Sequence, residues 1–227
     1  MRGKKRFCSA IALLLALLLA FAACGKPKPG SDAPDPSLPE DVAENGTEAF
    51  EALMEEFSAL ADIDDTAYVR TANSAAALNK VLAAGKSGAV RLKTADADLI
   101  SVPAGDYAGS TVALNAPNAG AVLEGEMDCV IAEALGAEGL TLNGGVKSLV
   151  VTGADIPVTL NGGAGRIYIQ GKSCTLRLAG GSFGEIVCVN SIVKIENGTQ
   201  TDVTVYMANG APQTLKAGET LQYGFSE

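Results

Sequence analysis

The side chains best suited to acid–base or ligand chemistry gather once in this sequence of 227 residues, at Glu124, Glu126 and Asp128. Alternation along an extended chain could bring Glu124 and Asp128 to one turn. Neighbouring carboxylates can act as general acid and general base, or can hold a divalent cation. The alternative is a solvated acidic loop, which we favour because the other acids of this region are scattered. We therefore predict no catalytic residue.

A second candidate is a patch formed by Tyr168, Gln170 and Tyr206. Ile167 and Ile169 flank Tyr168, so strand alternation turns the tyrosine to the side opposite the isoleucines. Tyrosine combines an apolar ring with a hydroxyl, which suits a binding surface. The sequence thus predicts an exposed ligand-binding patch, with ordinary strand surface as the alternative.

Missing and rare residue types exclude several chemistries. The chain has no His, which removes His-dependent triads, His-ligated zinc and His acid–base catalysis. Cys129, Cys174 and Cys188 form no CxxC motif and occupy different repeat positions, so we predict no metal and no evident disulfide. Cys188 takes an inward, apolar position. We also predict no cofactor.

The charge of the chain is concentrated near its N-terminal end. The formal net charge of -9 argues against nucleic-acid binding, which needs clustered Lys and Arg. Between Pro29 and Val69 stand 12 acids without a single Lys or Arg. We interpret this segment as a solvated spacer.

Residues 1–23 have the organisation of an export signal: four basic residues and then an apolar run from Ala10 to Ala23. A membrane span needs about 20 such residues, so the run is short. It ends in Phe21-Ala22-Ala23-Cys24-Gly25, which resembles the lipobox of bacterial lipoproteins. The resemblance implies a lipidated Cys24, with palmitate-type acyl chains that anchor the protein to a cell membrane, facing outside the cytoplasm. An ordinary signal peptide, or a membrane helix with a chance cysteine, is the alternative.

The rest of the chain divides into three segments. Residues 24–45 carry five prolines and form an acidic linker. Residues 46–69 contain an amphipathic helix over 46–62 and a connector; Asn45 and Glu48 have the spacing of a capping box. The apolar stripe of that helix must pack on another surface; it comprises Phe50, Leu53, Met54, Phe57 and Leu60. Residues 70–227 form the main domain, which includes a second helix from about Ser74 to Ala84.

The main domain repeats itself. Residues 140–145, 158–163 and 176–181 follow one another at intervals of 18, and 193–198 follow after 17. Apolar pairs recur between them, which gives two short strands per period. This pattern predicts an all-β solenoid of about six coils of ~18 residues. A calcium-binding roll has the same period, but Gly144-Gly145 is not followed by its aspartate, so calcium binding is not expected.

The stretch from Tyr68 to Tyr107 resembles the start of right-handed, pectate-lyase-like parallel β-helices. The resemblance rests on Val69-Arg-Thr71, on Leu78 and Leu82 of the second helix, and on the strands 89–92 and 102–107. It implies a right-handed parallel β-helix over roughly 68–225 whose first coil is plugged by that helix. Carbohydrate-active members of this group use carboxylate clusters.

Stacking the coils predicts specific neighbours. Arg166 should lie beside Glu185 as a surface ion pair, and Asn143 over Asn161 as a hydrogen-bonded ladder. The alignment also places Val193 over Leu176, with an outward column of Thr141, Thr159, Arg177 and Lys194. The segment 214–223 has the character of a cap over the last edge, which disfavours self-association through a bare coil end.

These observations predict a lipid-anchored cell-envelope protein that displays a non-catalytic β-helix for structural roles or for recognition of a glycan or a protein. The alternative is a carbohydrate-active lyase or hydrolase of the pectate-lyase-like fold. The expected partners are the membrane, through Cys24, and an envelope glycan or surface protein, but no nucleic acid.

Overall fold

The computed structural model describes residues 40–63, 69–85, 87–189, 192–207 and 211–224, with side chains from residue 48 onward. The predicted export signal and Cys24 lie outside these residues. Within them, neither helix combines the length and the apolar character needed to cross a membrane.

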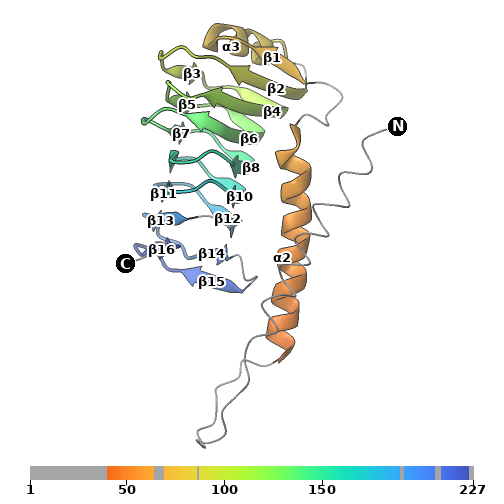
Figure 1. Ribbon diagram of the computed structural model, residues 1–227, viewed down its shortest axis with the longest axis vertical. Helices are drawn as coiled ribbons and strands as arrows, with labels where there is room; N and C mark the ends of the chain where they lie inside the picture. Colours follow the sequence, from red (N-terminus) through yellow and green to blue (C-terminus); the bar gives the residue numbers. More distant parts are fainter. Residues whose placement is uncertain (1–39, 64–68, 86, 190–191, 208–210, 225–227) are drawn as a thin grey trace, which may run out of the picture. The chain divides into compact units, whose positions relative to one another are not determined.

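The described residues form a parallel β-solenoid of about seven turns and two helices (Figure 1). The helices are α2 (Glu40–Ala61) and α3 (Ala75–Ala83). The strands are β1 (Arg70–Ala72), β2 (Gly88–Lys93), β3 (Ile100–Val102), β4 (Asp106–Ala116), β5 (Ala121–Leu123), β6 (Glu126–Leu135), β7 (Leu140–Leu142), β8 (Val146–Val151), β9 (Pro157–Leu160), β10 (Ala164–Ile169), β11 (Cys174–Leu178), β12 (Phe183–Cys188), β13 (Val193–Asn197), β14 (Val203–Tyr206), β15 (Pro212–Leu215) and β16 (Thr220–Tyr223).

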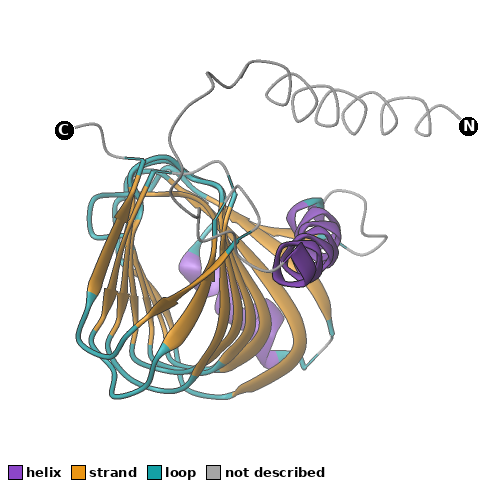
Figure 2. Cartoon of the chain, turned by 90° about the horizontal axis from the view of Figure 1, so that it is seen from below, coloured by secondary structure: helices purple, strands orange, loops and turns teal. Residues whose placement is uncertain are grey.

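The strands form two sheets that enclose one core. Sheet A has the order β1-β2-β4-β6-β8-β10-β12-β14-β15, and sheet B has the order β16-β13-β11-β9-β7-β5-β3. Figure 2 looks along the stack and shows the coils enclosing the space between the sheets. The predicted parallel β-helix is therefore confirmed. The prediction of six coils missed the turn that contains β2, because the count began at Leu99.

Each strand repeats the same inward positions, so the core consists of columns of like residues. In sheet B, Leu123, Leu142, Leu160 and Leu178 stack in register. All four are buried. Because each coil buries its apolar side chains against its neighbours, the core exists only in the stack.

Different devices close the two ends of the stack. At the first coil, α3 buries Leu78 and Leu82, and the Ser74 hydroxyl caps the helix by accepting the Ala77 N–H at 3.2 Å. The helix predicted over 74–84 is thus confirmed. At the last coil, β15 and β16 turn back and pair antiparallel with β14 and β13. The capped edge predicted at 214–223 is therefore present.

Two details of the predicted arrangement are wrong. Asn45 does not cap the first helix, because α2 begins at Glu40 and contains Asn45. Leu176 pairs with Ile195, not with Val193, so β13 is displaced by two residues from the predicted alignment. Lys194 consequently lies beside Thr175, and Glu196 takes the predicted place of Lys194 beside Arg177.

Candidate functional site

The outer face of sheet A carries a continuous row of side chains, here called the outer ladder. In successive strands its members are direct neighbours in register: Ala113, Ile131, Val150, Tyr168, Val187 and Tyr206. The residues that flank each member belong to the core between the sheets, so the ladder points away from it. The predicted outward orientation of Tyr168 and Tyr206 is therefore confirmed.

Helix α2 covers this ladder, and the predicted exposure of Tyr168 is wrong. Phe57 of α2 packs on Tyr168 with ring centroids 5.8 Å apart, and the tyrosine is 0% exposed. Its hydroxyl has no hydrogen-bond partner among the described residues. Burial raises the pKa of the Tyr168 phenol, and the Glu56 carboxylate raises it further. The ring is thus a packing element under a helix.

The other two members of the predicted patch do not restore an accessible aromatic surface. Gln170 is exposed where the chain leaves β10, and Tyr206 is half-buried against the cluster that α2 covers. Because Tyr168 is buried under α2, it does not form one open patch with Gln170 and Tyr206.

Arg166 ties α2 to two strands. Its guanidinium pairs with Glu56 of α2, and its Nε donates to Glu185 Oε2 of β12 at 3.3 Å. The predicted neighbourhood of Arg166 and Glu185 is confirmed, whereas the helix partner Glu56 was not anticipated. A small pocket of about 250 Å³ borders this ion-pair group and Tyr206.

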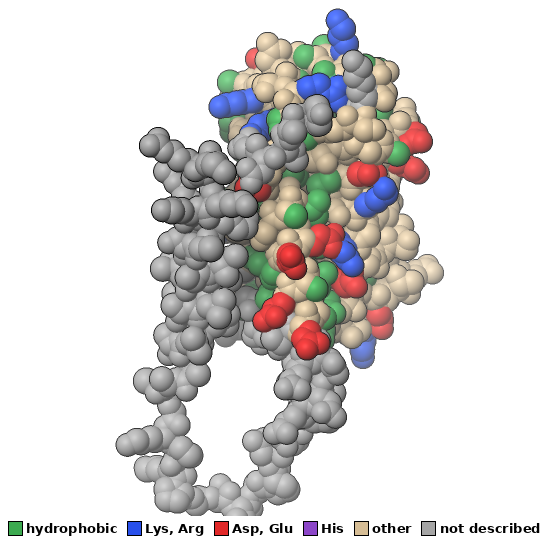
Figure 3. Space-filling model, turned by 90° about the vertical axis from the view of Figure 1, so that its right-hand side faces the viewer, with side chains coloured by type: hydrophobic (Ala, Val, Ile, Leu, Met, Phe, Trp, Pro, Cys, Tyr) green, Lys and Arg blue, Asp and Glu red, His purple; other side chains and the backbone are tan. Residues whose placement is uncertain are grey.

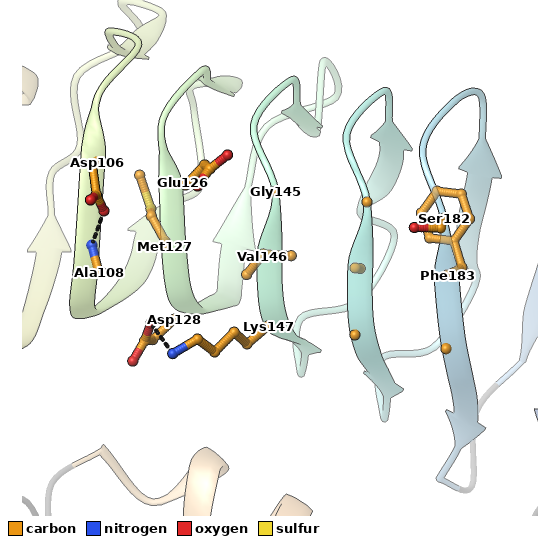
Figure 4. A pocket seen from close by; sticks show the side chains of 14 residues that line it. Asp106, Ala108, Glu126, Met127, Asp128, Gly145, Val146, Lys147, Ser182 and Phe183 are labelled. Carbon is orange, nitrogen blue, oxygen red and sulfur yellow. Dashed lines mark hydrogen bonds and ion pairs between the residues drawn. The ribbon is translucent and has the colours of Figure 1, made fainter.

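A larger hollow, here called the coil groove, lies where β4, β6, β8, β10 and β12 begin (Figure 4). It has a volume of about 600 Å³. Its lining residues are Asp106, Ala108, Glu126, Met127, Asp128, Gly145, Val146, Lys147, Gly163, Ala164, Gly165, Ser182, Phe183 and Gly184. One surface therefore runs across five consecutive coils.

Glycines give the coil groove its shallow floor. A Cβ atom on Gly165 would lie 2.6 Å from the Lys147 carbonyl oxygen, so the neighbouring coil leaves no space there. At Gly145 the nearest atom to such a Cβ is the Gly163 carbonyl oxygen at 3.9 Å, so this position opens onto free space. Gly165 is thus required by the stacking, whereas Gly145 only shapes the groove.

The charges of the coil groove gather at one end. Asp106 and Glu126 are exposed there, and Asp128 pairs with Lys147 at 2.8 Å. The hydrogen bond from Lys147 holds the pKa of the Asp128 carboxyl below its usual value. Two of the three predicted acids, Glu126 and Asp128, thus line one hollow, and Glu124 is not among its lining residues.

The three thiols of the solenoid are buried, in two environments. Cys174 and Cys188 lie in the core between the sheets, as predicted for Cys188, whereas Cys129 lies under α2 in the outer cluster. Burial raises the pKa values of Cys129 and Cys174 to about 12.

Sequence reasoning missed the coil groove and the place of α2. The groove had no clear signal, because the glycines that recur one coil apart at Gly165 and Gly184 mark the close approach of neighbouring coils. The place of α2 had a partial signal in Ile131, Val150 and Val187, which are apolar at outward positions. Comparisons with known protein families, with curated protein sequences and with solved structures gave no match.

Proposed function

We propose that this protein is a lipid-anchored protein of the cell envelope whose β-helix binds an extended envelope glycan in the coil groove without transforming it. The observation that carries the proposal is the groove itself, which crosses five coils. The lipobox-like sequence that ends in Cys24 supports the anchor, and the acidic linker supports a spacer between membrane and β-helix.

The dimensions and lining of the groove suit a polymer. Five strands at the usual ~4.8 Å spacing extend over about 19 Å, which is long enough for several units of a chain molecule. The carboxylates of Asp106 and Glu126 can accept hydrogen bonds from hydroxyl groups, and the Ser182 hydroxyl can donate or accept them. Phe183 is half-buried at the opposite end and offers a ring face.

The state of Asp128 argues against one catalytic role, that of a general acid. A general acid must be protonated near the working pH, and enzymes achieve this by raising the carboxyl pKa. Lys147 lowers the carboxyl pKa of Asp128, so this side chain stays a charged carboxylate. The alternative remains a lyase or hydrolase, as the resemblance to pectate-lyase-like β-helices implies, with Glu126 and Asp128 as its first candidates.

The test is binding of the full chain to an array of glycans and cell-wall polymers, with product analysis for every ligand that binds. Gly145→Leu fills the groove from a position with free space and should abolish binding, whereas its matched control Gly145→Ala should retain it. Binding that survives Gly145→Leu in a folded protein would contradict the groove as the site. Release of shortened or unsaturated sugars would contradict the non-catalytic proposal.

A further inference from the structure

Helix α2 is attached to the solenoid in a way that allows it to leave. We infer that α2 is a detachable cover: it undocks from the outer ladder while the coils beneath it remain folded, and so uncovers an apolar row that the docked state hides. This inference does not depend on the proposed function, because it concerns contacts among residues 48–207.

The first argument is that two separate cores exist. The solenoid core lies between the sheets, and the outer cluster lies between sheet A and α2. Leu53 and Phe57 belong to the outer cluster, which shares no residue with the solenoid core. The sheet stands between them, so undocking α2 removes no side chain from the inner columns. Local opening of this kind is expected where a segment contributes little to the main core.

Second, in the described residues, side chains alone join α2 to the solenoid. Helix α2 belongs to neither sheet, and its ion pair across this interface joins Glu56 to Arg166. Both side chains of that pair are about one third or more exposed, at 33% and 42%. Such pairs contribute little to stability, so the docked state rests mainly on apolar packing.

The third argument is that α2 is a weak helix by itself. It contains seven acids, no Lys or Arg, and Gly46 in its interior. The exposed side of the helix carries Glu48, Glu51 and Glu55. Figure 3 shows several acidic side chains on the face of the molecule turned toward the viewer. Like charges one turn apart repel, and no basic residue in the last turn compensates the helix dipole. Docking onto sheet A therefore sustains the helix.

Cys129 provides a natural reporter of this motion. It is 3% exposed and lies in the cluster that α2 completes, whereas Cys174 and Cys188 lie between the sheets. Undocking of α2 would bare Cys129 and leave the other two thiols protected. Opening of the whole solenoid would bare all three together.

The experiment is thiol alkylation of the full native chain with N-ethylmaleimide, with the rate at each cysteine measured by peptide mass spectrometry. We expect Cys129 to react at least about 10-fold faster than Cys174 and Cys188, because local opening is more frequent than global unfolding. Phe57→Ala removes the ring on Tyr168 and should accelerate alkylation of Cys129 by about 200-fold or more, as expected for loss of a buried aromatic side chain. The rates at Cys174 and Cys188 should not change.

Two controls separate undocking from other causes. Glu55→Ala alters the exposed side of α2 and removes one like-charge repulsion, so it should slow the Cys129 reaction by no more than about 2-fold. Fraying of β6 would also bare Cys129 but would not respond to Phe57→Ala. The inference is overturned if the three thiols react at one common rate, or if Phe57→Ala leaves the Cys129 rate unchanged. If Phe57→Ala exposes all three thiols, α2 is part of the global fold and the inference also fails.

Discussion

Replacing Asn197 with leucine is expected to destabilise the C-terminal end of the solenoid, although the repeat itself would place a leucine there. Asn197 pairs in register with Leu178 and stands at the end of the leucine column of sheet B. It is 1% exposed. A buried amide in an apolar column is costly unless its hydrogen-bonding groups are satisfied.

The hydrogen bonds of Asn197 explain why the amide is present. Its Nδ2 donates to the carbonyl oxygens of Thr201 at 2.9 Å, Leu215 at 3.2 Å and Lys216 at 3.1 Å. Its Oδ1 accepts from the backbone N–H of Thr199 at 3.2 Å and from the Thr199 hydroxyl at 2.7 Å. One side chain thus holds the end of β15 and the turn that follows β13. The stack therefore ends at β13 and β14, where β15 and β16 pair with them antiparallel and no further coil follows in the described residues.

The size of the effect follows from the groups that leucine would leave unpaired. Losing the hydrogen bond to the buried Leu215 carbonyl would cost about 1–3 kcal/mol. Losing the part-buried bonds to the Thr201 and Lys216 carbonyls and to the Thr199 N–H would cost roughly 0.5–1 kcal/mol each. The added apolar burial of leucine would offset about 1–2 kcal/mol of this loss. We expect a net decrease of about 2–4 kcal/mol in the free energy of unfolding.

Urea unfolding followed by far-UV circular dichroism measures this change, and amide hydrogen exchange in β15 and β16 shows whether the cap loosens first. Asn143→Leu is the matched control, because Asn143 is exposed and hydrogen-bonded to Asn161; it should change stability by less than about 1 kcal/mol. An Asn197→Leu protein as stable as the native one, with unchanged exchange in β15 and β16, would refute the reasoning.

Three further predictions concern single contacts. Gly165→Ala should lower the melting temperature, with a loss of about 2 kcal/mol, because its Cβ would lie 2.6 Å from the Lys147 oxygen. Gly145→Ala should be nearly neutral, and equal losses at the two positions would contradict the stacking argument. NMR titration should give Asp128 a pKa below the usual value, with Lys147→Met raising it. The small stability contribution of this ion pair is present above the unfolded carboxyl pKa and is lost as the pH falls through the lowered folded value. Ser74→Ala should cost about 1 kcal/mol in urea unfolding through loss of the α3 cap, whereas exposed Ser58→Ala should have a much smaller effect.

The coil geometry could be predicted from sequence where equivalent positions carry equivalent residues. Asn143 and Asn161 are separated by one period, and their side chains are hydrogen-bonded at 2.7 Å. Cys188 takes the inward position of Val151 and Ile169, as expected. Both follow from the constant coil length in the middle of the stack.

The alignment failed at β13 because glycine was taken as a fixed marker of the turn. Gly198 resembles the glycines that end earlier coils, and this likeness set the 17-residue interval to Val193. In the structure, Asn197 occupies the core position that Leu178 occupies one coil earlier, so Ile195 lies over Leu176. The polar residue in an inward position was the clue to the end of the repeat, but its partners come from β15 and the adjacent turns, which no local pattern identifies.

The error over Tyr168 has another origin. Alternation gave its direction correctly, but exposure depends on what lies beyond the strand. The stripe of α2 indicated that the helix needs a partner surface, and the apolar outward residues of β6, β8 and β12 indicated that a surface needs a cover. Periodicity cannot show that the stripe of α2 covers these strands, because helix and strands are far apart in the sequence and are joined only by packing.

Helix α2 runs along the stack, and its N-terminal end extends beyond β15 (Figure 1). A helix of 22 residues rises about 33 Å at 1.5 Å per residue, and the seven strands from β2 to β14 span about 29 Å at ~4.8 Å per step. Duplicating residues 146–163 would add one coil without disturbing the inner columns, and it would lengthen the outer ladder by about 4.8 Å. Covering each added coil takes about three residues of helix, so the length of α2 limits how many coils can be added before apolar side chains of the outer ladder become exposed.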